Sequence, residues 1–151
     1  MENKKIDYSA QGKRNRAAGQ RFEAKVREGL EKMDWVVSKW MNVVDQDKNG
    51  NIGGIIPAKR KYNPFNKAMV IGTGFPDFVA FKKTKDNYEI IGVEVKTNGY
   101  LDKVEKGMCV WLLQNNIFSK ILIAKKKKIN ERKFEVEYVD FEEKYGKKQN
   151  S

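Results

Sequence analysis

Asp77, Glu94 and Lys96 are the residues of this chain whose types and spacing suggest chemistry. Asp77 follows Pro76, sixteen residues separate it from Glu94, and one residue separates Glu94 from Lys96. Carboxylate oxygens suit Mg²⁺ or Mn²⁺, and Mg²⁺ commonly takes a substrate phosphate as a further ligand. The pattern therefore predicts a site for phosphodiester hydrolysis, whereas a Glu-x-Lys pair alone is equally typical of a solvent-facing ion pair.

The residues around Glu94 and Lys96 alternate as in a β-strand, from Glu89 to Lys96. Glu94 and Lys96 share one face of this strand with Gly92, which we expect to leave room for a phosphate or a metal ion. The proline before Asp77 fixes the direction of a preceding strand, so a hairpin of the two strands would put Asp77 beside Glu94. A cation between the two carboxylates would relieve their repulsion. The lysine would hold the attacking water or stabilise charge on the phosphate.

The composition excludes several classes of mechanism. The chain has no histidine and one cysteine, Cys109, which excludes imidazole-based catalysis, Cys-rich zinc sites and an intrachain disulfide. It has 31 lysines and arginines against 20 acids, an excess that modestly favours a polyanionic partner over a merely solvated surface. The N-terminus is unlike a signal peptide and no apolar run could span a bilayer, so we expect a cytoplasmic protein without a membrane partner.

The pattern of apolar residues predicts the α/β class, with a mixed central sheet flanked by helices. A helix is expected from about Arg16 to Met33, and a second from Asp102 to Asn115, where Asp102 and Glu105 fit an N-terminal cap. The predicted strands are Trp35–Trp40, Phe78–Phe81, Glu89–Lys96, Ser119–Ala124 and an edge strand, Lys133–Phe141.

The boundaries follow from the same pattern. One domain is expected over residues 16–141, between a flexible basic tail, 1–15, and a charged tail, 142–151. The stretch 45–68 is predicted to be a long connection, functional or partly disordered. Its start imitates a calcium-binding loop, but Ile56 stands where a bidentate glutamate belongs, so calcium binding is rejected.

Three groups of basic residues are candidates for contact with a phosphate backbone, although such charge runs are more often solvated surfaces. One lies in the long connection beside aromatic residues, one follows Glu105 in its helix, and one follows a buried strand. The candidates are Lys59, Arg60, Lys61, Lys106, Lys125 and Lys126.

Pro76-Asp77 followed by Glu94-Val95-Lys96 matches the motif of the PD-(D/E)XK nucleases. Within that superfamily the chain most resembles the archaeal Holliday-junction resolvases and the VRR-NUC nucleases. Gly19-Gln-Arg-Phe22-Glu23 is similar to a sequence on their N-terminal helix, and Glu105 stands where they carry glutamine on the helix after the Glu-x-Lys strand. The resemblance covers roughly residues 19–126.

The resemblance implies a restriction-endonuclease-like fold and hydrolysis of DNA with Mg²⁺ or Mn²⁺. On the residues alone, Glu23 is also a possible i,i+4 partner of Arg27, and Glu105 a simple helix cap. The implied catalytic residues are Asp77, Glu94, Lys96, Glu23 and Glu105, and the implied metal ligands are Asp77, Glu94 and Val95.

The leading hypothesis is an endonuclease that recognises branched DNA such as a four-way junction, which would require a homodimer to make two symmetric cuts. A sequence-specific, restriction-like endonuclease is one alternative, and only residues 45–68 offer it a base-reading element. A nucleic-acid-binding module without turnover is another. An RNA-splicing endonuclease of similar fold is disfavoured because its chemistry uses histidine.

Overall fold

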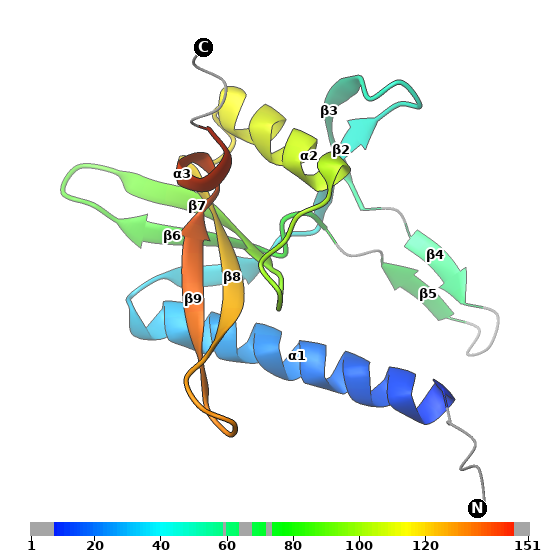
Figure 1. Ribbon diagram of the computed structural model, residues 1–151. Helices are drawn as coiled ribbons and strands as arrows, with labels where there is room; N and C mark the ends of the chain where they lie inside the picture. The colour runs from blue at the N-terminus through cyan, green and yellow to red at the C-terminus, as the bar shows by residue number, and fades with distance from the viewer. Residues whose placement is uncertain (1–7, 59, 64–67, 72–73, 147–151) are drawn as a thin grey trace, which may run out of the picture.

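The computed structural model describes residues 8–58, 60–63, 68–71 and 74–146, and for residues 8, 60–63 and 68–71 it describes the main chain (Figure 1). Within this part of the chain the elements are α1 (Tyr8–Lys32), β1 (Val36–Lys39), β2 (Asn42–Gln46), β3 (Ile52–Pro57), β4 (Arg60–Asn63), β5 (Ala68–Ile71), β6 (Phe78–Lys83), β7 (Tyr88–Val95), α2 (Lys103–Gln114), β8 (Lys120–Lys128), β9 (Phe134–Asp140) and α3 (Phe141–Tyr145).

Five strands form a mixed sheet in the order β1-β6-β7-β8-β9. Neighbouring strands are antiparallel except β7 and β8, which are parallel and joined through α2, as a parallel crossover requires. The helices α1 and α2 lie on opposite sides of this sheet (Figure 1). The predicted α/β domain with a mixed sheet between helices is therefore confirmed at this level.

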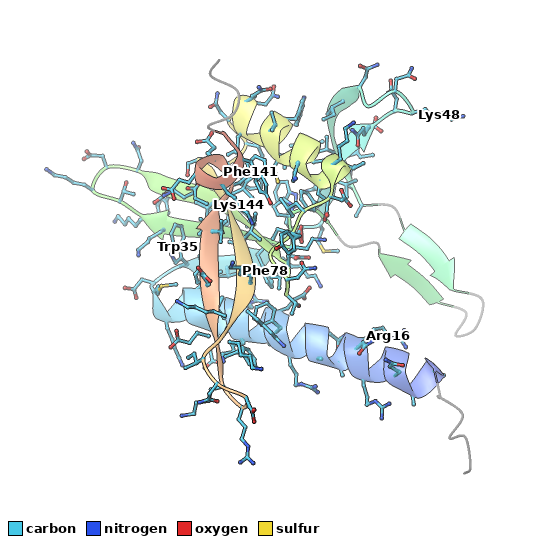
Figure 2. All side chains as sticks on the ribbon, in the orientation of Figure 1. Arg16, Trp35, Lys48, Phe78, Phe141 and Lys144 are labelled. Atoms are coloured by element: carbon cyan, nitrogen blue, oxygen red, sulfur yellow. The ribbon has the colours of Figure 1, made fainter. Side chains whose placement is uncertain are left out.

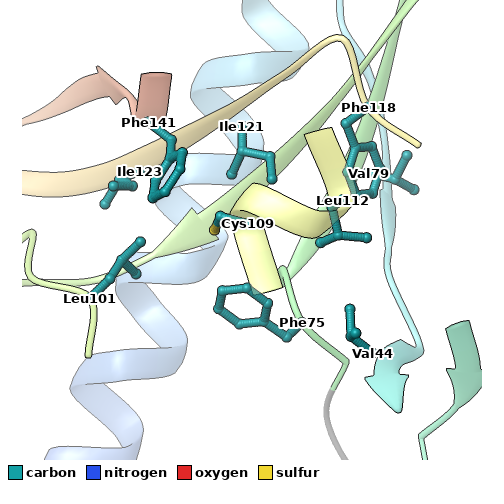
Figure 3. Close-up of a cluster of buried hydrophobic side chains, with 10 residues drawn as sticks. All are labelled: Val44, Phe75, Val79, Leu101, Cys109, Leu112, Phe118, Ile121, Ile123 and Phe141. Atoms are coloured by element: carbon teal, nitrogen blue, oxygen red, sulfur yellow. The ribbon is translucent and has the colours of Figure 1, made fainter. Parts of the chain in front are cut away.

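Each helix buries an apolar stripe against one face of the sheet. Phe22, Val26 and Leu30 of α1 are buried against a cluster that includes Ile91 and Val93 of β7. The cluster on the α2 side is shown in Figure 3; its buried members are Val44, Phe75, Val79, Leu101, Cys109, Leu112, Phe118, Ile121, Ile123 and Phe141. The face of β7 that was expected to be apolar is therefore the one covered by α1.

The first helix begins earlier than predicted. We expected it from about Arg16, after a flexible tail, but α1 already begins at Tyr8. Residues 8–15 carry no apolar stripe, which is why the helical period was not visible there. Alanine, glutamine, lysine and arginine nevertheless have high helix propensity, and these types dominate the first turns of α1.

The long connection is also more structured than predicted. It contains β3, which forms a hairpin with β2, and the main chain of β4, which forms a second hairpin with β5. Val44 of β2, just before this stretch, is buried in the α2-side cluster. The stretch that imitates a calcium loop is the β2–β3 turn. There the Asp47 carboxylate accepts hydrogen bonds from the main-chain N–H groups of Asn49 (2.8 Å) and Asn51 (2.9 Å). Asp47 thus closes a turn, a common role of aspartate.

The C-terminal segment after residue 141 is not simply a tail. Asp140 caps the short helix α3 by accepting a hydrogen bond from the Glu142 N–H (2.9 Å), and Phe141 is buried in the α2-side cluster. Through residue 146, this part of the chain belongs to the domain. Among the helices in the described ranges, none is both long and apolar enough to cross a bilayer.

Candidate active site

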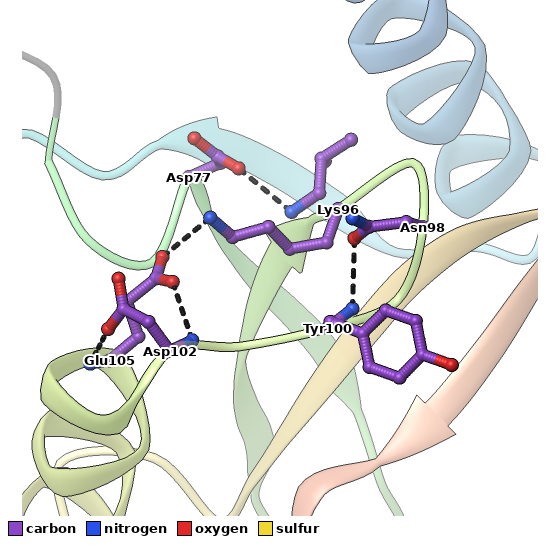
Figure 4. A network of polar contacts seen from close by, with 7 residues as sticks. Asp77, Lys96, Asn98, Tyr100, Asp102 and Glu105 are labelled. Atoms are coloured by element: carbon purple, nitrogen blue, oxygen red, sulfur yellow. Dashed lines mark hydrogen bonds and ion pairs between the residues drawn. The ribbon is translucent and has the colours of Figure 1, made fainter.

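The antiparallel pairing of β6 and β7 brings Asp77 and Glu94 together. Phe78 pairs with Val93, so one further residue along each strand leads to Asp77 and Glu94. The Asp77 carboxylate accepts a hydrogen bond from the Val95 N–H at 2.8 Å, which fixes it at the end of β7 (Figure 4). The expectation that a hairpin puts Asp77 beside Glu94 is therefore confirmed.

We expected Gly92 to leave room for a ligand, but the space beside it is filled. A Cβ built on Gly92 would lie 2.8 Å from Pro76 Cγ and 3.2 Å from the ring of Phe118. Pro76 and Phe118 fill this space, so the absence of a side chain at position 92 serves packing. Pro76, the residue before Asp77, therefore packs closely against β7, the strand that carries Glu94.

Glu94 is a buried acid, with 4% of its surface exposed. Burial, helped by the hydrogen bond to Asp77 and the negative charge of Asp77, raises the pKa of Glu94 to about 11. Its Oε2 atom is buried and has no hydrogen-bond partner among the described residues. A buried carboxylate oxygen without a partner is costly, and such atoms in native proteins call for an explanation.

Lys96 is held by Glu105 at the start of α2. Its Nζ lies 2.7 Å from Glu105 Oε2, and both side chains are mostly buried (Figure 4). Burial acts to lower the pKa of Lys96, but the hydrogen bond and charge of Glu105, together with Glu94, raise it above 10.5. At neutral pH Lys96 is therefore protonated and donates hydrogen bonds without accepting any.

Glu105 caps its helix and also contacts Lys96; its catalytic role stays a prediction. Its Oε1 accepts a hydrogen bond from the Asp102 N–H (3.1 Å), while the Asp102 carboxylate accepts one from the Glu105 N–H (2.8 Å). These two bonds form the predicted capping box. The other oxygen of Glu105 binds Lys96. The start of α2 and the orientation of Lys96 are thus coupled through one side chain.

Glu23 of α1 lies on the side of the site formed by Asp77. Partial burial raises the pKa of Glu23, the charge of Asp77 raises it further, and Lys39 at the end of β1 opposes the shift. Its alternative partner, Arg27, instead pairs with Glu31 (3.2 Å) and donates a hydrogen bond to the Val37 carbonyl. The sequence did not predict Lys39 at the site, because its position depends on the pairing of β1 with β6, which puts Lys39 opposite Phe78.

Cys109 lies on α2 close enough to the site to respond to its charges. Burial, with smaller effects of Glu94 and Glu105, raises the pKa of Cys109 to about 12. The thiol therefore stays protonated and behaves as a small apolar core residue, which argues against a nucleophilic role.

The basic candidates are spread over several parts of the surface. Lys106 Nζ lies 4.7 Å from the ring centroid of Tyr145, and Lys125 Nζ lies 3.7 Å from Glu137. Lys126 is on the α1 side of the sheet, with Nζ 4.5 Å from the Phe134 ring and 5.3 Å from the Phe22 ring. Lys59 lies outside the described residues, and of Arg60 and Lys61 the structure describes the β4 main chain.

The donor set at the site fits a hard divalent cation. Two carboxylates, Asp77 and Glu94, converge, and the free Oε2 of Glu94 is the kind of atom that such an ion binds. No three acidic or cysteine side chains in the described ranges form a metal-sized cluster, so Glu23 and Glu105 do not complete a carboxylate cage. The expected ligand set of Asp77, Glu94 and Val95 stays a prediction, and solvent or substrate oxygens would supply further ligands.

The chain matches no protein-family model, no curated protein sequence and no solved structure. Its function therefore has to be argued from the geometry of Asp77, Glu94, Lys96 and their surroundings.

Proposed function

We propose that this chain is a metal-dependent endonuclease of the PD-(D/E)XK type, with a restriction-endonuclease-like fold, that hydrolyses DNA phosphodiester bonds. The observation that carries the proposal is the pair of carboxyl groups, Asp77 and Glu94, at adjacent strand ends with one buried oxygen unpartnered. Such a pair is costly in the metal-free protein, because Glu94 has to be protonated to stay buried beside Asp77. A site that must bind a cation requires it.

In this proposal Asp77 and Glu94 would hold Mg²⁺ or Mn²⁺ together with the main-chain carbonyl of Val95. When bound, such an ion polarises the scissile phosphate and lowers the pKa of a water ligand. The hydrogen bond from the Val95 N–H orients Asp77 before any ligand arrives. Preorganisation of this kind is what a rigid strand-end site contributes to catalysis.

Lys96 would act as a fixed cation at the scissile phosphate. Since the ion pair with Glu105 keeps it protonated, Lys96 is unsuited to take a proton from water. It would instead donate a hydrogen bond to the attacking water, or stabilise the charge that develops on the phosphate oxygens. Glu105 would be a positioning residue, and Glu23, next to Asp77, would contribute a further carboxylate at the edge of the site.

The preferred substrate in this proposal is branched DNA, cut by a homodimer in the cytoplasm. The test is cleavage of a labelled four-way junction and of linear duplexes with the same sequences, in Mg²⁺ or EDTA. Asp77→Asn removes a negative charge with little change in volume, and Asp86→Asn does the same in the exposed β6–β7 turn. Paired nicks at the junction that need Mg²⁺ and Asp77, and persist in Asp86→Asn, are the expected result.

Other outcomes of this experiment separate the alternatives. Cleavage of linear duplexes at one sequence would favour a restriction-like enzyme over a resolvase. Binding of DNA without cleavage in Mg²⁺ or Mn²⁺ would contradict the enzyme and leave a DNA-binding module. Sedimentation of the protein with and without the junction would show whether the active species is a dimer.

A further inference from the structure

The N-terminal half of α1 projects beyond the end of the sheet that carries the site. The helix runs along the sheet so that Phe22 lies near the site end, where Lys126 and Phe134 contact it, and Lys32 lies near the start of β1. The N-terminal part of the helix continues past the five-stranded sheet, towards the side where β4 and β5 lie, as its blue end shows (Figure 1). At 1.5 Å per residue this extension is about 20 Å long.

The extension is basic and has no apolar face. Between Ser9 and Arg21 there are four basic residues, no acids, no aromatic residues and no aliphatic side chain larger than alanine. The first turn of α1 contains no acidic residue, although the helix dipole favours one there. The basic side chains are Lys13, Arg14, Arg16 and Arg21, all exposed and without an ion pair to any described residue.

These features select the chemistry of a partner. A helix without an apolar stripe cannot dock on a hydrophobic groove, and a helix without aromatic residues offers no platform for stacking the bases of a single strand. Exposed basic side chains along a helix suit the regularly spaced phosphates of a duplex. The partner that fits is therefore the backbone of double-stranded DNA.

The extension is also aligned with the site. Arg16 is seven residues, or two helical turns, before Glu23, so the two side chains leave the same face of α1. Glu23 is close enough to Asp77 for the charge of Asp77 to raise its pKa. Arg16 is labelled on the projecting part of the helix in Figure 2. A phosphate bound by Arg16 would lie about 10 Å along the helix from Glu23.

A second basic element lies at the same end of the sheet. The last β7–β8 pair joins Val95 to Ala124, and the next four residues of β8 are lysines that pair with β9. Beyond them, a hollow in the β8–β9 turn is lined by residues that include Lys126, Lys128, Arg132 and Lys133. The β8–β9 turn thus adds basic side chains at the end of the sheet from which α1 extends, with Lys126 over the Phe22 ring.

We infer that residues 9–21 of α1 form a duplex-binding arm, in which Lys13 and Arg16 bind phosphates of the DNA that flanks the scissile bond. The inference rests on the proposed nuclease function for its alignment with the site. The arm increases affinity for duplex flanks without reading sequence, since contacts to phosphate carry no base information.

The test is binding of a 24-base-pair duplex and a 24-nucleotide single strand over a series of salt concentrations, in EDTA. Lys13→Gln/Arg16→Gln removes two charges and keeps helix-forming side chains. Lys83→Gln/Lys85→Gln removes two exposed charges at the turn end of the sheet and is the matched control. The arm variant should bind the duplex on the order of tenfold more weakly, with a slope of log K against log salt reduced by up to about 1.8.

The control should retain wild-type affinity and slope, and single-strand binding should change little in either variant. An equal loss of affinity in the two variants would overturn the inference, because it would show a general effect of charge. Cleavage in Mg²⁺ is read separately. If the wild type cuts DNA and the arm variant binds as tightly as the control, the arm is wrong and the nuclease stands. If the arm effect is present without any cleavage, the nuclease is wrong and the arm stands.

Discussion

The two ends of the β6–β7 hairpin carry charged residues in opposite arrangements. Near the turn, Lys82 pairs across the strands with Glu89, which also lies 3.4 Å from Lys120. At the open end, the same register brings Asp77 next to Glu94. Opposite charges across a strand pair stabilise a sheet and like charges destabilise it. The turn end has the arrangement expected from stability alone, and the open end has the arrangement expected of a cation site.

The two ends also differ in their exposure to water. The side chain of Glu89 is 29% exposed, so solvent screens its charge. Glu94 is 4% exposed, and its burial raises the pKa to about 11. Acidic residues alone therefore do not identify the site, since both ends of the hairpin carry them. A buried acid beside a second carboxyl group distinguishes the open end from an ordinary surface.

The largest expected effect is the difference in cleavage rate between substitutions at the two ends of the hairpin. Glu94→Gln keeps the size of the side chain and removes a metal-binding charge, so we expect cleavage in Mg²⁺ to fall on the order of 10³-fold or more. That exceeds the roughly 10–100-fold typical of residues that only orient metal ligands. Glu89→Gln, the same change at the turn end, should leave the rate within twofold of wild type. Equal cleavage rates of the two variants would contradict the proposed role of Glu94 as a metal ligand.

Glu105→Gln should have a smaller effect on cleavage. Glutamine can still accept the hydrogen bond from the Asp102 N–H, but it can no longer provide a negative charge for Lys96. We expect a loss of roughly 10–100-fold in kcat, as for other orienting partners, with little change in DNA affinity. Glu105→Ala should lose the cap as well and lower the melting temperature. A loss of affinity with unchanged kcat would contradict a positioning role.

Much of this site was predictable because its signals are local. The alternation of β7, the apolar stripe of α1 from Phe22 onwards and the Asp102–Glu105 capping box each lie within one short segment. The pairing of Asp77 with Glu94 needed one further assumption, a hairpin of adjacent strands. Such information is present in the sequence itself.

What escaped prediction depends on segments far apart in the chain. Position 92 needs glycine because Pro76 and Phe118 fill the space beside it. Lys39 lies near the site because β1 pairs with β6. The extension of α1 has no apolar stripe, so its helix is supported by propensity alone and gives no periodic signal. The β2–β3 hairpin is rich in glycine and polar residues, which are equally typical of a loop.

The stability of the metal-free protein should depend on pH because of Glu94. The pKa of Glu94 is raised from 4.5 to about 11, so its contribution to stability is complete below pH 4.5 and is lost as the pH rises towards 11. We expect the melting temperature in EDTA to fall between pH 5 and pH 8.5, a range that stays below the titration of Cys109. Glu94→Gln should flatten this slope and stabilise the apo protein at pH 8 by roughly 3 kcal/mol.

Two controls accompany that measurement. Glu89→Gln should leave the pH slope unchanged, because Glu89 is solvated. Mg²⁺ should raise the melting temperature of the wild type at pH 8 and have little effect on Glu94→Gln. A wild-type melting temperature that rises with pH in EDTA would contradict the assigned direction of the shift.

Gly92→Ala tests the packing between the two ends. The added methyl group would meet Pro76 and Phe118 at 2.8 and 3.2 Å, so we expect a loss of roughly 1–3 kcal/mol in the free energy of unfolding. Because Pro76 precedes Asp77, cleavage by the folded fraction should fall as well. Gly53→Ala, in the β2–β3 hairpin, is the matched control, since the nearest atom to its Cβ would be an Asp45 oxygen at 3.7 Å. Wild-type stability of Gly92→Ala would show that the space can open for a ligand.

The smallest expected effect is at the turn end. Glu89 and Lys120 are both partly exposed and 3.4 Å apart, and exposed pairs of this kind contribute about 0.2–1 kcal/mol. A double-mutant cycle of Glu89→Gln and Lys120→Gln should give a coupling energy within this range by chemical denaturation, and it should decrease in 0.5 M salt. The corresponding cycle of Asp77→Asn and Glu94→Gln in EDTA should give a coupling energy that depends on pH, because Glu94 keeps its hydrogen bond to Asp77 only while it is protonated. If the coupling between Asp77 and Glu94 did not change with pH, the contrast between the two ends of the hairpin would be lost, and with it the main physical reason for placing a cation between Asp77 and Glu94.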